Sequence, residues 1–178
     1  DIQFIGNKTD ALRLDGSARG TVYNAAYTGN TGYGVFANGG TTSVLNMSTA
    51  AFTGNGGVVK LAPATGVFNL SGPVSVTNSG IAGIDVLADA NLGSIVRTWS
   101  NPGMPYVLRS GDVNLRSGLN IAPGVVVKLQ TSSLTSQEGA ITALATSAQP
   151  IIFTSLKDDG GGGDTNNDGA TTAPAAGN

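Results

Sequence analysis

The sequence predicts an all-β fold, a parallel β-solenoid in which about three short strands form each coil and about seven coils stack along one axis. Two periodic features and one absence predict this fold. Asparagines recur at a nearly constant spacing, and short apolar runs recur at the same spacing. No segment shows the sustained i, i+3, i+4, i+7 apolar spacing that is typical of an amphipathic helix.

The recurring asparagines mark one corner of the predicted coil. They end the blocks FIGN, YTGN and FTGN, and two later asparagines continue the phase, with steps of 23, 25, 23 and 23 residues. Coils of equal length place equivalent residues above one another, and a side-chain amide both donates and accepts hydrogen bonds. The sequence therefore predicts a structural ladder of asparagines along the solenoid. Its members are Asn7, Asn30, Asn55, Asn78 and Asn101.

A large apolar side chain lies two or three residues before each of these asparagines. Because the spacing is the same, we expect these side chains to stack on one another in the core. They are Phe4, Tyr27, Phe52, Val76 and Trp99.

Short apolar runs with strand-like alternation recur in the same phase, and Gly, Asn, Asp and Pro separate them. Arg13, Lys60 and Asp85 hold equivalent positions inside these runs, and we predict that they line the solvated side of one strand. The core-facing residues that set the phase follow one another at steps of 23, 24 and 25 residues. They are Leu12, Val35, Val59 and Ile84.

The period divides the chain into two parts of one continuous solenoid. Residues 1–98 keep coils of 23–25 residues, whereas residues 99–178 form further coils with looser spacing. The run GVVVKL at 124–129 repeats GVVKL at 57–61, which indicates that the second part still has coils. It ends in an acidic Gly/Asp/Asn loop at 157–169.

The acidic loop is the best candidate for a binding site. Its segment 164–169, DTNNDG, has the D-x-N-x-D-G spacing of calcium loops, in which alternate oxygen ligands turn inward and glycine permits the sharp turn. The twelfth position is Ala175 and not Glu, so the loop is not an EF-hand. We predict a calcium site here, while a solvated loop that binds nothing stays open as the alternative. The proposed ligands are Asp158, Asp159, Asp164, Asn166 and Asp168.

Three segments of the second part carry a resemblance. PYVLRSGDVNLRSGLNIAPGVVVKL, AITALATSAQPIIFTS and KDDGGGGDTNNDG resemble right-handed parallel β-helix segments with the pectin-lyase-like fold, found in large secreted or cell-surface bacterial proteins. The resemblance covers residues 99–178 and implies a right-handed coil. In that family a Trp and another strand usually follow the loop, so we expect the chain to be a piece of a longer protein.

Composition excludes several classes of function. The chain has no histidine and no cysteine, so it cannot carry a Ser-His-Asp triad, a cysteine nucleophile or a His-ligated zinc. Only 9 residues are Lys or Arg and the net charge is −2, which gives no basic face for nucleic acid. No apolar stretch is long enough for membrane insertion.

These observations favour a structural or adhesive segment of an extracellular or cell-surface bacterial protein. Copies of such a segment can join end to end into a homo-oligomeric fibre, because the open ends of a solenoid are edge strands. The alternative is a module that binds or degrades a surface polysaccharide. Degradation needs paired carboxylates, or calcium with an Arg or Lys base, on one face, and the pattern indicates neither. We therefore predict that the chain is not an enzyme.

Overall fold

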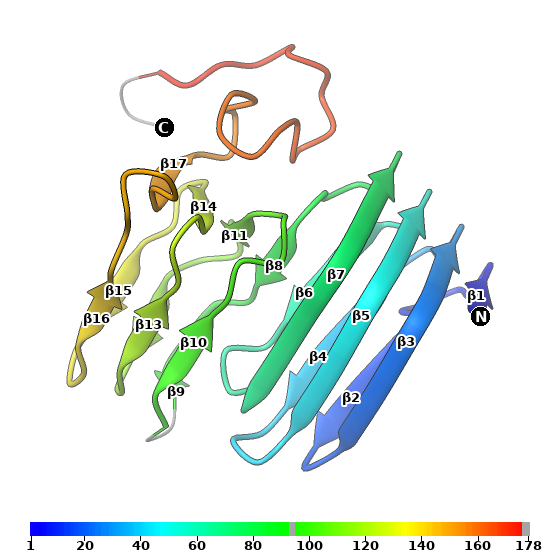
Figure 1. Cartoon of the computed structure of the whole chain (residues 1–178), viewed down its shortest axis with the longest axis horizontal. Helices are drawn as coiled ribbons and strands as arrows, with labels where there is room; N and C mark the ends of the chain where they lie inside the picture. Colours follow the sequence, from blue (N-terminus) through cyan, green and yellow to red (C-terminus); the bar gives the residue numbers. More distant parts are fainter. Residues whose placement is uncertain (93–94, 176–178) are drawn as a thin grey trace.

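The structure is a computed structural model that describes residues 1–92 and 95–175. Within these residues there are 17 strands and no helix. Every strand pair is parallel, and each strand pairs with a strand of the next coil. The predicted parallel β-solenoid is confirmed (Figure 1).

One sheet runs along the whole molecule. It has seven strands, and seven strands in one wall delimit six complete turns. The chain therefore makes about six turns, one fewer than the sequence predicts. In spatial order the strands are β17 (Ile152–Ser155), β14 (Val126–Leu129), β11 (Tyr106–Leu108), β8 (Ile84–Val86), β6 (Gly57–Leu61), β4 (Tyr33–Gly39) and β2 (Leu12–Gly16).

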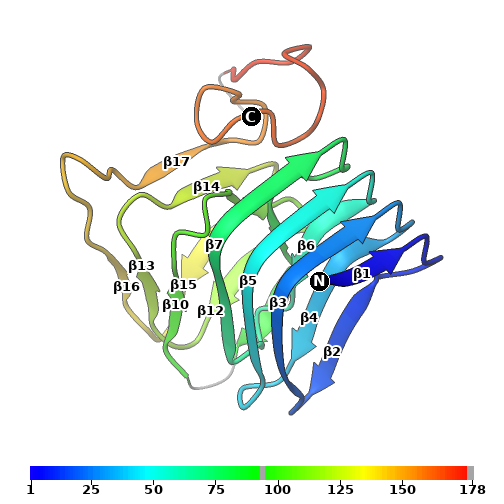
Figure 2. The ribbon, with the colours of Figure 1, turned by 45° about the vertical axis from the view of Figure 1, so that its right-hand side comes forward.

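Long strands form the rest of the N-terminal coils. Three of them have 10 or 11 residues, and each bends at a residue with positive φ: Asn24 (52°), Thr49 (51°) and Gly72 (74°). The bend lets one strand cover two walls of the coil, and Figure 2 shows the three strands curving together. This four-stranded sheet consists of β1 (Ile2–Ile5), β3 (Arg19–Thr28), β5 (Val44–Thr53) and β7 (Val67–Thr77).

The C-terminal coils have three separate short strands each. Two further three-stranded sheets replace the curved one, so the predicted three strands per coil hold here, while the N-terminal coils have two. One sheet contains β9 (Asp89–Leu92), β12 (Val113–Leu115) and β15 (Leu134–Ser136). The other contains β10 (Arg97–Trp99), β13 (Leu119–Ile121) and β16 (Ile141–Ala143).

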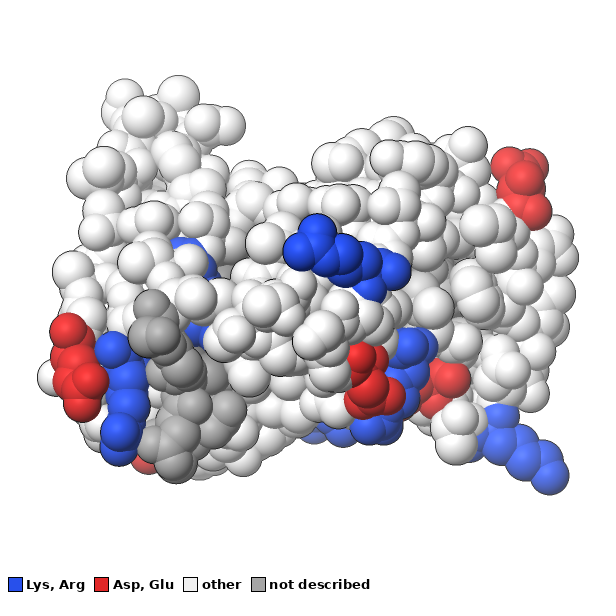
Figure 3. Space-filling view, turned by 90° about the horizontal axis from the view of Figure 1, so that it is seen from below, with Lys and Arg blue, Asp and Glu red and all other residues white. Residues whose placement is uncertain are grey.

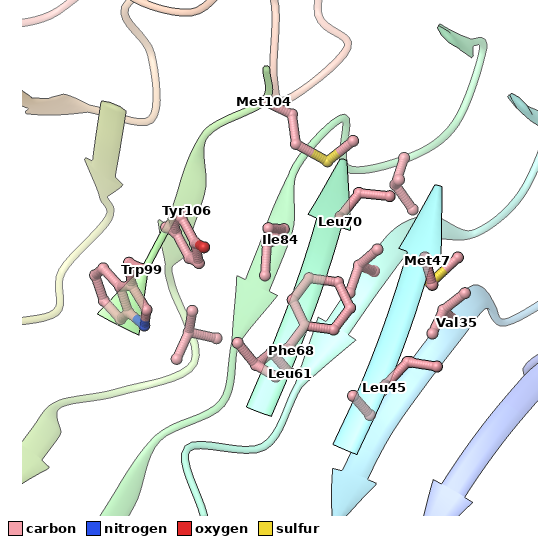
Figure 4. Packing of buried hydrophobic residues seen from close by; sticks show 14 of the residues in the cluster. Val35, Leu45, Met47, Leu61, Phe68, Leu70, Ile84, Trp99, Met104 and Tyr106 are labelled. Carbon is pink, nitrogen blue, oxygen red and sulfur yellow. The ribbon is translucent and has the colours of Figure 1, made fainter. Parts of the chain in front are cut away.

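The register of the long sheet follows the apolar runs. Leu12 pairs with Val35, Val35 with Val59, and Val59 with Ile84, as the spacing predicts. Their side chains and those of the opposite walls meet inside the coil, where Phe68, Leu70 and Tyr106 lie in the core (Figure 4).

Aromatic rings stack along the axis, as expected for the N-terminal coils. The rings of Phe4, Tyr27 and Phe52 are each 4.8 Å apart and nearly parallel. Trp99 stacks instead on Tyr106, at 4.6 Å. The row therefore repeats only while successive coils keep the same length.

The asparagine ladder exists but is shorter than predicted. The side-chain amide of Asn7 donates to Oδ1 of Asn30 (2.7 Å), and the amide of Asn30 donates to Oδ1 of Asn55 (2.7 Å). Asn30 and Asn55 are buried, so the ladder satisfies polar groups that water does not reach.

The ladder does not extend to Asn78 or Asn101, which corrects the prediction. Thr53 pairs with Thr77, so Asn78 aligns with Gly54, and both adopt positive φ (50° and 64°). Ser79 occupies the ladder position, and its hydroxyl accepts a hydrogen bond from the backbone of Asn55. Asn101 is exposed and caps a turn, accepting from the amide of Gly103. Asparagine, like glycine, can adopt the left-handed backbone conformation. Asn78 therefore takes the place that Gly54 holds in the preceding coil, one residue before the ladder position.

The underside of the molecule carries few charges (Figure 3). In the face drawn in Figure 3, charged side chains are few and neither sign forms a continuous patch. Within the described residues no helix is sufficiently long and apolar to traverse a bilayer.

Candidate metal-binding loop

The acidic loop folds back over the outside of the long sheet. It begins after β17 and lies against the coil of β8, three strands away in that sheet (Figure 1). The backbone of Ala82 donates to the carbonyl of Thr165 (2.9 Å), and Thr165 is fully buried. Leu156 packs with Ile81 and Val107 in a small apolar cluster outside the main core. The loop is therefore docked on the sheet and is not an extended solvated segment.

Three of the predicted ligands converge in this loop. Asp159, Asp164 and Asp168 each place one carboxylate oxygen so that all three lie within 4.8 Å of one another. Oxygens around one Ca²⁺ lie about 2.3–2.6 Å from the ion, so they can be up to about 5 Å apart. The triad can thus hold a metal ion.

The DTNNDG segment takes its shape from Asp164. The carboxylate of Asp164 accepts hydrogen bonds from the backbone amides of Asp168 (3.0 Å) and Gly169 (2.9 Å). Asn167 and Gly169 have positive φ (57° and 65°), which closes the turn. Asp168 is thereby brought back beside the residue that begins the segment.

Several oxygens of the loop are buried without a hydrogen-bond donor. They are Oδ1 of Asp159, Oδ1 of Asn166 and Oδ1 of Asp168. An ionised carboxylate and an amide oxygen can only accept, so each buried oxygen needs a donor or a cation. These atoms belong to two triad members and to the predicted ligand between them. The chemistry of the donor set fits a hard cation.

Asp158 is the predicted carboxylate ligand that lies outside the triad. Its carboxylate accepts from the hydroxyl of Thr154 (2.6 Å) and from the amides of Gly160 (3.0 Å) and Gly161 (3.3 Å). The bond from Thr154, followed by the backbone amides, lowers the pKa of Asp158. Asp158 therefore shapes the start of the loop.

Lys128 completes the site, and the sequence analysis missed it. Its side chain is fully buried under the loop. Its Nζ donates to the carbonyls of Asp158 (2.7 Å) and Gly163 (2.6 Å). Burial lowers the pKa of Lys128, while the nearby charges of Asp158, Asp159 and Asp164 act in the opposite direction. The repeat of GVVKL in GVVVKL was the available signal, because it places Lys128 on the outward side of its strand.

The outward side of the long sheet carries one continuous row of residues. Adjacent strands pair through these positions, so the row follows from the register alone. It contains Arg13, Phe36, Lys60, Asp85, Val107, Lys128 and Thr154.

The prediction that this row is solvated is wrong for Asp85, which is only 1% exposed. Arg109 forms an ion pair with its Oδ2 (2.9 Å), and the hydroxyl of Tyr33 donates to the same oxygen. Burial, strengthened by Asp85, raises the pKa of Tyr33 to about 12. Tyr33 is thus a protonated donor at neutral pH, and Oδ2 of Asp85 accepts from both Tyr33 and Arg109. The other oxygen, Oδ1, is buried without a hydrogen-bond donor in the described part of the chain.

Comparisons with known proteins give no family for this chain. No family model matches it, no curated protein matches it, and no solved structure matches it. The function must therefore be argued from the solenoid and its loop.

Proposed function

We propose that this chain is a rigid structural or adhesive segment of an extracellular or cell-surface bacterial protein, with Ca²⁺ fixing its side loop. The observation that carries the proposal is the single parallel sheet that continues from β2 to β17. About six turns at about 4.8 Å each give this wall a length of roughly 30 Å. Hydrogen bonds between strands run along the axis, so stretching the segment loads the hydrogen bonds between successive coils.

Calcium is the ion that best suits the loop. The ligands would be oxygens of Asp159, Asp164, Asn166 and Asp168, with the charge of Asp158 nearby. A flexible, oxygen-only set rich in carboxylates favours Ca²⁺ over Mg²⁺, which requires near-ideal octahedral geometry. The ion would neutralise clustered carboxylates and so hold the glycine-rich loop against the sheet.

Titration calorimetry with Ca²⁺, and with Mg²⁺ as comparison, tests the ion. Asp164→Asn should abolish the heat of binding, because it removes a charged ligand while keeping the shape of the side chain. Asp112→Asn, at an exposed turn that contacts Ser133, makes the same change in net charge and should bind as the unaltered chain does. Equal binding by both variants, or none by the unaltered chain, excludes this calcium site.

The cell-surface setting follows from the resemblance of residues 99–178 to right-handed pectin-lyase-like β-helix segments. A chain without cysteine that carries few charges suits such a segment. The terminal coils support assembly, because they have open edges and exposed apolar side chains that a further coil, of the same chain or of another copy, can cover. These side chains are Ile2, Ile5, Ile141, Leu144 and Phe153.

A surface polysaccharide is the partner that the outer surface suits best. A groove of about 450 Å³ lies along β1, β3, β5 and β7, and small uncharged side chains such as Ala26, Ala51 and Ser75 line its floor. A neutral glycan would meet one charged residue in this groove, Asp1, and otherwise uncharged side chains.

Electron microscopy and a depolymerisation assay test the structural role. We expect short rods or end-to-end fibres of uniform width, and no release of reducing or unsaturated ends from pectin, alginate or chitin. Cleavage of any of these polymers at an enzymatic rate would replace the structural proposal with the enzymatic alternative.

A further inference from the structure

We propose that Lys128 is a positioning residue, one that organises the loop for its ion. This inference rests on the proposed binding of Ca²⁺ and adds the residue on which the geometry of the site depends. Lys128 donates through Nζ to two carbonyls, at 2.7 and 2.6 Å, and within the described residues it forms no ion pair with an acidic side chain.

The two carbonyls have a particular place in the chain. They belong to Asp158 and Gly163, which immediately precede Asp159 and Asp164. One ammonium group therefore ties together the two peptide units that carry two of the three triad carboxylates. Fixing these peptide units fixes the backbone positions from which the side chains of Asp159 and Asp164 extend. The hydrogen bonds of Lys128, which is not itself a ligand, therefore position two of the ligands.

The segment between the two carbonyls needs such a clamp. Residues 160–163 are four consecutive glycines, and Gly162 and Gly163 both have φ of +78°. Glycine loses more backbone freedom on ordering than any other residue, so closing this segment is costly. Within the part of the chain that the structure describes, the amides of Gly160 and Gly161 bond only to the carboxylate of Asp158, which orders the start of the segment but not its end.

Lys128 can hold the loop in place because its own backbone is fixed within the sheet. It lies in β14 between strands β11 and β17, paired with Val107 on one side and Thr154 on the other. Its charge is buried and is answered by carbonyl oxygens, which can accept from it without using the carboxylates. Lys128 therefore occupies none of the triad oxygens.

A purely electrostatic role of Lys128 and a positioning role predict opposite changes in Ca²⁺ affinity when Lys128 is removed. A buried ammonium near a cation site repels the cation, so removing it should tighten binding if charge alone matters. If Lys128 positions the loop, removing it should weaken binding, because the carboxylates are no longer held together. The direction of the change in affinity distinguishes the two roles.

The experiment measures Ca²⁺ affinity by calorimetry on the unaltered chain and on Lys128→Met, which keeps the buried aliphatic stem and loses both hydrogen bonds. The matched control is Lys60→Met, which lies in the same outward row but contacts the rings of Phe36 and Tyr33 instead of the loop. Positioning predicts an affinity about tenfold weaker or more for Lys128→Met and an unchanged affinity for Lys60→Met. Hydrogen exchange of the amides of residues 160–163 without Ca²⁺ should be faster in Lys128→Met.

Equal or tighter binding by Lys128→Met overturns this inference and leaves the calcium site intact, whereas no binding by the unaltered chain removes both. If Lys128→Met does not fold, Gly163→Ala decides the question. A methyl group there meets nothing within 4 Å but strains a positive φ, so it disturbs the backbone whose carbonyl accepts from Lys128. We expect weaker binding from Gly163→Ala, and unchanged binding would likewise overturn the inference.

Discussion

The N-terminal coils and the C-terminal coils of this solenoid are stabilised in different ways. Strands β3, β5 and β7 have 10 or 11 residues. Tyr27 and Phe52 of the aromatic stack lie in β3 and β5, and the ladder residues Asn30 and Asn55 follow these two strands. The strands from β8 onward have only three or four residues, and the acidic loop packs on the long-sheet side of these coils, where it contacts Lys128. A repeat that keeps its length is stabilised by rows of like residues, whereas an irregular one depends on a particular loop contact.

The largest expected effect tests the stack of the N-terminal coils. Phe52 is fully buried and stacks on Tyr27, so Phe52→Ala should leave a cavity and lower the free energy of unfolding by about 3–5 kcal/mol. Phe153→Ala makes the same change on β17, where the ring is 50% exposed, and should cost much less. Urea unfolding of both variants measures the difference, and equal losses would contradict the proposed contrast between the two regions.

The ladder should contribute less than the stack. Asn30→Ala removes the buried amide that accepts from Asn7 and donates to Asn55, and it should cost about 1–3 kcal/mol. Asn69→Ala is the control, because its amide donates to Asn46 on the exposed outside of the same coils. We expect Asn69→Ala to change urea stability by less than about 0.5 kcal/mol. A similar loss in both variants would show that burial of the ladder is unimportant.

Replacing one residue of the aromatic stack, Tyr27, should increase the stability of the fold. The hydroxyl of Tyr27 is buried and has no hydrogen-bond partner in the described part of the chain, whereas Phe4 and Phe52 fill the same position in the adjacent coils. Tyr27→Phe should therefore raise the free energy of unfolding by about 1 kcal/mol, since it removes an unsatisfied polar group. Tyr23→Phe, at an exposed ring, is the control and should have no effect. A destabilised Tyr27→Phe would mean that the hydroxyl has a partner, such as an ordered water.

The sequence predicts the regular coils well because equal coil lengths appear directly as a constant spacing between equivalent residues. The spacing from Leu12 to Ile84 predicts the register, and the spacing from Asn7 to Asn55 predicts the ladder. The prediction failed at Asn78, since asparagine serves both as a ladder residue and as a substitute for glycine at positive φ.

Contacts across the irregular part could not be predicted in the same way. Lys128 meets Gly163 across 35 residues, and Arg109 meets Tyr33 across 76 residues. Neither spacing is a multiple of the repeat that the sequence displays. The burial of Asp85 was missed for the same reason, because strand alternation gives the side of a residue and not what covers it.

The smallest global effect should come from removing the ion, and it should be confined to the loop. Chelation with EGTA should lower the free energy of unfolding by about 1 kcal/mol, since the ion stabilises only the state that binds it. Trypsin should then cut faster after Lys157, at the start of the loop, whereas cutting after Arg13 in the N-terminal coils should not change. Arg13 is already exposed and pairs with Asp15 far from the loop, so it is an internal control. If chelation speeds cutting at both sites equally, the ion stabilises the whole solenoid; if it speeds neither, no ion is bound in the loop.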